Sequence, residues 1–170
     1  MGVLKAATIS ECGLYRYSLG RAWTQEGGLL MFVMLNPSTA DAYEDDPTIR
    51  RCIGFARDAG FGGIWVGNLF AFRATKPAEL WAAKAEGVDI EGPDNVEALN
   101  LMASKSKAIV CAWGAHGAKA PEEVDAVGKS FEPSRELLCL GTTKDLHPRH
   151  PLYLSKMARF ETWRDGEVRS

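Results

Sequence analysis

The sequence lacks the features that mark several protein classes. Its 20 Lys and Arg residues nearly balance 22 Asp and Glu residues, the formal net charge is −2, and no basic run stands out. It therefore has no overall field that would attract nucleic acid. No apolar run approaches the length that crosses a bilayer, and no basic stretch followed by an apolar one opens the chain. We expect a cytoplasmic protein with no membrane contact.

Cysteine and histidine are few, at four and three residues. The cysteines stand far apart, with no C-x-x-C pair and no His at metal spacing, so we expect no metal site. Cys52, Cys111 and Cys139 lie in apolar segments, where a free thiol packs as a small hydrophobic side chain. The glycine motifs of nucleotide triphosphatases, α/β-hydrolases and dinucleotide dehydrogenases are absent too. We expect no cofactor.

The composition is that of an ordinary globular protein, with 46% hydrophobic and 25% charged residues in a chain of 170. That length suits one domain, residues 1–170. We divide it into an N-terminal edge strand or hairpin, residues 1–28, and a core, residues 29–160.

Four segments are apolar enough to be buried strands: residues 29–35, 63–70, 107–113 and 136–141. Residues 29–35 show no alternation and should form a central strand. Residues 14–23 mix aromatic and polar side chains and predict an edge strand that leads by a hairpin into residues 29–35.

Helices are expected between these strands. Asp46 can cap a helix whose first residue is Pro47, with apolar residues recurring at helical spacing up to Gly60. Further helices are expected around Pro77, after Asp94 as a cap, and over residues 121–131. The alternation of strands and helices predicts an α/β fold: a three-layer sandwich around a mainly parallel four-stranded sheet.

Each apolar strand runs into a polar or glycine-bearing loop. The carboxyl ends of parallel strands meet at one edge of the sheet, where open α/β sheets bind ligands. Asn36 directly follows residues 29–35, and Pro37 holds its backbone. Its amide could orient a water molecule or bind a ligand, and Ser38 and Asp41 follow it, Asp41 as a possible general base. Alternatively, all these polar groups satisfy turn amides.

Asn68 ends the strand over residues 63–70, at a position where its amide could read the edge of a nucleobase. It could instead only join the strand end to the loop. Phe70 is an aromatic residue close enough to contact a base, and Arg73 could contact phosphate or simply be solvated.

The loop after residues 136–141 contains His147, Arg149 and His150 within four residues. Such a stiff, donor-rich segment suits an anion or an oxygen on which negative charge develops. His116, after the strand over residues 107–113, is a further candidate, although its small neighbours could serve only close packing.

The sequence resembles two known protein families. Nearly the whole chain resembles the bacterial and phage family DUF1643, which implies no activity. The resemblance rests on six segments in the same order: YRYSLGRAW, LNPSTAD, DDPTIRRC, GNLFAFRATKP, CAWGAHG and HPRHPLYL.

The loop order is also similar to that of the uracil-DNA glycosylases, DNA-repair hydrolases with an α/β fold. That resemblance implies that Asn36 positions water, Asn68 reads a base, His147 stabilises the departing base, and Leu152 wedges into a vacated stack. The Gln-Asp-Pro-Tyr motif of the best-known members is replaced by residues 35–38, Leu-Asn-Pro-Ser, which implies a slower or different reaction.

The sequence therefore predicts a protein that recognises a nucleobase, a nucleotide or single-stranded or modified nucleic acid. As an enzyme it would hydrolyse an N-glycosidic bond. Two alternatives remain: a module that binds the same ligands without cleaving them, and a partner-binding protein in which the polar loops are dispensable.

Overall fold

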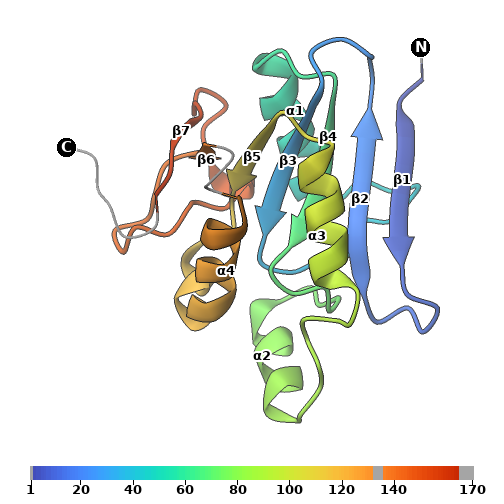
Figure 1. The fold of residues 1–170 in the computed structure, drawn as a ribbon, viewed down its shortest axis with the longest axis vertical. Helices are drawn as coiled ribbons and strands as arrows, with labels where there is room; N and C mark the ends of the chain where they lie inside the picture. The colour runs from blue at the N-terminus through green and yellow to red at the C-terminus, as the bar shows by residue number, and fades with distance from the viewer. Residues whose placement is uncertain (1, 132–135, 165–170) are drawn as a thin grey trace.

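The fold is built around one sheet of seven strands (Figure 1). The computed structural model describes residues 2–131 and 136–164 of the chain. Across the sheet the strands follow the order β1-β2-β4-β3-β5-β6-β7. Their bounds are β1 Leu4–Ile9, β2 Arg16–Ala22, β3 Leu29–Met34, β4 Gly63–Asn68, β5 Ala108–Cys111, β6 Leu137–Cys139 and β7 Glu161–Thr162.

The four apolar segments form the strands β3 to β6 in the middle of this sheet. They run parallel to one another, and β3 is the central strand, as its unbroken apolar sequence predicts. The other three strands pair antiparallel, β1 with β2, β2 with β4, and β7 with β6. The α/β class is confirmed. The expectation of a mainly parallel four-stranded sheet is wrong, because the sheet is larger and mixed.

The N-terminal segment also pairs differently from the prediction. β2 lies inside the sheet next to β4, and it forms a hairpin with β1, which occupies the edge. The chain between β2 and β3 passes directly over the start of β4, where a Cβ on Gly62 would lie 2.0 Å from the carbonyl oxygen of Glu26. Gly27, with a φ of 78°, allows this close passage. β4 can therefore lie between β2 and β3.

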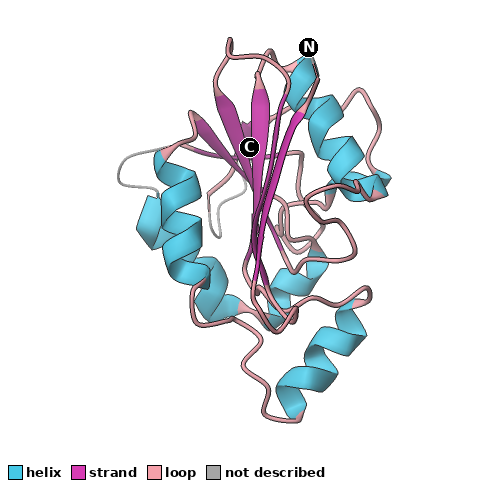
Figure 2. Cartoon of the chain, turned by 90° about the vertical axis from the view of Figure 1, so that its right-hand side faces the viewer, coloured by secondary structure: helices cyan, strands magenta, loops and turns pink. Residues whose placement is uncertain are grey.

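Helices cover both faces of the sheet (Figure 2). α1 (Pro47–Asp58) packs on one face, against side chains of β3 and β4. α3 (Asn95–Ser104) and α4 (Pro121–Phe131) pack on the other. α2 (Pro77–Ala85) lies beyond the carboxyl ends of β3 and β4 (Figure 1). No helix in the described ranges is long and apolar enough to span a membrane.

The starts of α1 and α3 differ in how they are capped. Asp46 accepts a hydrogen bond from the Ile49 amide at 2.9 Å, and Pro47 is the first helical residue, as the sequence predicts. Asp94 precedes α3, but its side chain makes no capping hydrogen bond, so that prediction is wrong. Nδ2 of the Asn95 side chain instead donates to the carbonyl oxygens of Asn68 and Leu69, which holds α3 against the end of β4.

The cysteines behave as expected. Cys52, Cys111 and Cys139 are buried, and no disulfide joins the cysteines. Burial raises the pKa of Cys139 to about 11, so its thiol is protonated at neutral pH.

Candidate ligand-binding site

A cavity of about 540 Å³ opens at the carboxyl edge of the parallel strands, beside the start of α1. Its wall includes the end of β3, the first residues of α1, the loop after β5 and the loop that follows β6. Its volume is typical of a site for a small organic ligand. This is the edge at which the strand order places the polar loops.

Five of the predicted site residues line this cavity: Asn36, Ser38, His116, His150 and Leu152. They come from three loops that are far apart in the sequence. The other seven, Pro37, Asp41, Asn68, Phe70, Arg73, His147 and Arg149, do not line it.

Asn36 follows β3 and joins two loops. Its Nδ2 donates to the carbonyl oxygens of Pro37 at 3.1 Å and Ala74 at 2.8 Å. Both amide protons are therefore used within the protein. The atom that Asn36 can offer to a ligand or a water molecule is its acceptor, Oδ1.

His150 precedes the short 3-10 helix η2 (Pro151–Tyr153), and its Nδ1 accepts a hydrogen bond from the Leu152 amide at 3.3 Å. Burial lowers the pKa of His150, and the nearby negative charge of Asp46 opposes that shift. The ring is therefore neutral at neutral pH. Because Nδ1 accepts, the proton is assigned to Nε2, which makes His150 a hydrogen-bond donor at the cavity.

The lowered pKa of His150 predicts a pH dependence of stability. As pH falls through the ordinary histidine value of about 6.5, the unfolded state binds the proton first, so the free energy of unfolding decreases. Urea denaturation at about pH 7.5 and about pH 5.5 should therefore show a larger loss for the wild-type protein than for His150→Gln. Equal losses would contradict a neutral, partly buried His150.

Gly114 connects the loop after β5 to the loop containing His150. Its backbone has φ 74° and ψ −170°, a conformation that is essentially restricted to glycine. Its amide donates to the carbonyl oxygen of Pro148 at 2.8 Å, and a Cβ at Gly114 would lie 3.4 Å from the Cβ of His150. The neighbouring Trp113 is 1% exposed and packs edge-on against Trp163 at a centroid distance of 5.1 Å. This part of the wall is therefore rigidly supported.

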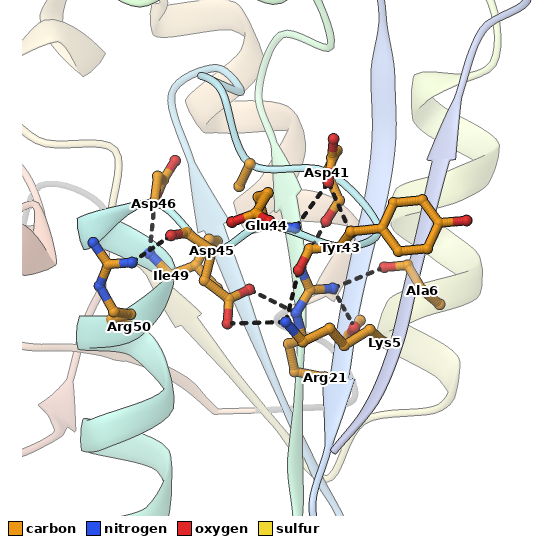
Figure 3. Close-up of polar contacts among 12 residues, drawn as sticks. Lys5, Ala6, Arg21, Asp41, Tyr43, Glu44, Asp45, Asp46, Ile49 and Arg50 are labelled. Carbon is orange, nitrogen blue, oxygen red and sulfur yellow. Dashed lines mark hydrogen bonds and ion pairs between the residues drawn. The ribbon is translucent and has the colours of Figure 1, made fainter. Parts of the chain in front are cut away.

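Asp41 lies outside the cavity and caps a turn. Its Oδ1 accepts from the Tyr43 amide at 2.7 Å and from the Glu44 amide at 2.9 Å (Figure 3). These hydrogen bonds lower the pKa of Asp41. This is the geometry of the turn cap that the sequence offers as the alternative role of Asp41.

Asn68 and Phe70 are buried. Asn68 is 2% exposed, and within the described residues neither amide atom of its side chain has a hydrogen-bond partner. In the sheet it pairs with Met34, which lines the cavity, so Asn68 lies one strand away from the wall. Phe70 is 1% exposed and packs edge-on against Trp81, in the core rather than at the site.

The remaining predicted residues surround the cavity. Arg73 lines an adjoining cavity of about 340 Å³, which shares Ser38 with the first. His147 lies next to Gly117. A Cβ placed on Gly117 would lie 3.1 Å from Nδ1 of His147. Arg149 is exposed and donates from Nε to the Thr142 carbonyl oxygen at 2.9 Å, while Pro37 is buried. None of these side chains lines the larger cavity.

Arg16 is not among the residues that the sequence predicts for the site, yet it lines the cavity although it is only 2% exposed. Burial lowers its pKa to about 10, so it is still cationic at neutral pH. The available signal was a charged residue between Tyr15 and Tyr17, inside a strand. Asp46 was interpreted only as a cap, and it lines the cavity as well.

The chemistry available here comes from neutral donors and acceptors, one buried cation, Arg16, and one carboxylate, Asp46. Within the described ranges, no three His, Cys, Asp or Glu side chains are grouped closely enough to hold a metal ion. The site can bind a polar ligand through Asn36, Ser38 and His150, and it can place a positive charge beside that ligand through Arg16.

Comparison with known proteins gives a family. No curated protein and no solved structure matched the chain. The similarity of its loop order to the uracil-DNA glycosylases therefore has no support from these comparisons. The family model described as "Protein of unknown function (DUF1643)" matches residues 16–152. This match covers most of the 170 residues, and the chain belongs to the DUF1643 family.

Proposed function

We propose that the protein recognises a nucleobase or nucleotide in the cavity of about 540 Å³ at the carboxyl edge of the sheet and hydrolyses its N-glycosidic bond. The observation that carries this proposal is the convergence of Asn36, His116 and His150 on one cavity at the carboxyl edge of the sheet. A water acceptor and a neutral donor are two groups that this hydrolysis requires on opposite sides of the bond that breaks.

In the proposed reaction, the oxygen of water attacks the anomeric carbon while the bond to the base nitrogen breaks. The bonding electrons leave with the base, and the water loses a proton to solvent. Oδ1 of Asn36 accepts a hydrogen bond from the water and orients it. Nε2–H of His150 donates to the base as negative charge develops there.

The rim of the cavity offers a surface for the base. Tyr153 lines the cavity and is 89% exposed, so its ring is free to stack on a planar ligand. Leu152, beside it, adds apolar contact. Asn68 would read the base only if the ligand reached beyond the wall that Met34 forms.

Binding without cleavage is the second candidate, and the carboxylates favour it. Asp46 lines the cavity but accepts the hydrogen bond that caps α1. Asp41 is engaged by two turn amides. One oxygen of each carboxylate is engaged by backbone amides, and Asp41 lies outside the cavity, so neither carboxylate is placed there solely as a base for water, the role a carboxylate often has in hydrolysis.

The test is a thermal-shift screen against bases, nucleosides, nucleotides and short single-stranded oligonucleotides, some containing uracil, with mass spectrometry of each mixture. We expect a stabilising ligand and release of its free base. Asn36→Ala should slow base release by about 100-fold, whereas Asn100→Ala, an exposed asparagine on α3, should not change it.

The outcomes separate the candidates. Stabilisation without free base would favour the binding module. No stabilisation and no product across the panel would contradict the proposal and favour a partner-binding protein.

A further inference from the structure

Strand β2 carries two buried arginines, Arg16 and Arg21, which differ in how far the protein satisfies their charge and hydrogen-bond donors. Arg21 is 1% exposed, and its Nε donates to Asp45 Oδ1 at 2.8 Å (Figure 3). Its Nη1 donates to the carbonyl oxygen of Gly20 at 2.8 Å, and its Nη2 to that of Asp41 at 2.6 Å. The charge and the donors of Arg21 are therefore satisfied within the protein.

Arg16 is equally buried but is not satisfied in this way. Its guanidinium donates from Nη1 to the Ala40 carbonyl oxygen at 2.6 Å, and its Nε has no partner among the described residues. Among the described residues, no carboxylate lies within ion-pair distance of the Arg16 guanidinium. Unlike Arg21, Arg16 lines the cavity of about 540 Å³ at the carboxyl edge of the sheet.

The groups that surround Arg16 in the cavity suit an anion. Ser38, Thr39 and Thr48 line the same space and carry hydroxyl donors. Arg73 lies in the adjoining cavity, whose wall also includes Ser38 and Thr39. The acidic group of the wall, Asp46, accepts the capping hydrogen bond of α1, and its charge acts on Arg16 only from beyond ion-pair distance.

A buried cation without a counterion is costly, whereas a guanidinium fork binds a phosphate through two parallel hydrogen bonds. We propose that Arg16 anchors an anion subsite, and that the ligand of the cavity carries a phosphate group. On this basis the ligand is a nucleotide, free or within a single strand, rather than a base or nucleoside. The nucleotide identity rests on the proposed function, whereas the anion subsite rests on Arg16 alone.

The test compares the affinity of nucleoside monophosphates with that of the matching nucleosides, by calorimetry, in the wild-type protein and in Arg16→Met. We expect the wild-type protein to bind the monophosphate at least about 30-fold more tightly. Arg16→Met should bring the two affinities close to equality, and Arg16→Lys, which keeps the charge but loses the fork, should lie between. Arg159→Met, at an exposed arginine, is the matched control and should keep the preference.

Thermal unfolding without ligand checks the folding of the variants. Arg16→Met removes an unpaired buried charge, so its Tm should lie within about 3 °C of the wild-type value or above it. Arg16→Lys provides a second reading should Arg16→Met fail to fold. A short single-stranded oligonucleotide in the same titrations separates the two sources of phosphate, because the tighter-binding ligand identifies the source.

Two further results distinguish this inference from the proposed function. Equal affinity of the wild-type protein for nucleoside and monophosphate would overturn the anion subsite and leave nucleobase recognition standing. Binding of inorganic phosphate or pyrophosphate that Arg16→Met abolishes, with no nucleoside-bearing ligand bound, would support the subsite and contradict the proposed function. No Arg16-dependent binding of any phosphate would overturn the inference.

Discussion

Replacing Asp45 by alanine should lower the free energy of unfolding by about 3 kcal/mol. Asp45 is the partner of Arg21 at 2.8 Å, and the side chain of Arg21 is fully buried. The substitution leaves a guanidinium in the protein interior without its counterion, and an uncompensated buried charge dominates the cost. Urea denaturation followed by circular dichroism measures the change.

A matched control is Asp125→Ala. Asp125 pairs with Lys129 at 2.6 Å on the exposed face of α4, where water screens the interaction. That variant should keep nearly the wild-type stability. If the two variants lost the same free energy of unfolding, main-chain carbonyls alone would compensate the charge of Arg21. The ion pair with Asp45 would then not hold the loop over residues 41–46.

Gly114→Ala should lower the free energy of unfolding by about 2 kcal/mol and abolish ligand binding at the cavity. Alanine at φ 74° and ψ −170° is strained, and its Cβ would contact His150. Relief of that strain requires the backbone at residue 114 to leave this conformation, which would break the hydrogen bond from its amide to the Pro148 carbonyl oxygen, in the loop containing His150. The wall that brings His116 and His150 together would then be lost.

The control for this substitution is Gly54→Ala, in the exposed part of α1, where a Cβ meets no atom within 4 Å. Alanine favours a helix, so this variant should gain about 0.5 to 1 kcal/mol. If Gly114→Ala kept both stability and ligand binding, the connection between the two loops would not shape the site.

The parts of the fold that the sequence predicts well are those set by local chemistry. Asp46 and Pro47 specify the start of α1, and the unbroken apolar run over residues 29–35 specifies a strand covered on both faces. The partner of β2 is set instead by a chain crossing at Gly62, which has no local signature. β1 was missed because residues 4–9 are largely exposed and show no apolar face.

The candidate site was predictable at the level of loops but not of single side chains. The strand order brings the loops of Asn36, His116 and His150 to one cavity. Whether His147 or His150 lines the cavity depends on η2, which turns the chain after His150. Arg16 was missed because burial of a charged side chain depends on residues far from it in the sequence.

Nucleotide recognition at this site is tested most directly by titrating the ¹⁵N-labelled protein with the four common nucleoside monophosphates and following the amide chemical shifts. We expect at least one ligand to shift the amides of Ser38, Gly114 and Leu152 along one saturable binding curve. No saturable shifts, or shifts confined to the separate pocket that Leu99 and Val127 line between α3 and α4, would contradict nucleotide recognition at the carboxyl edge of the sheet.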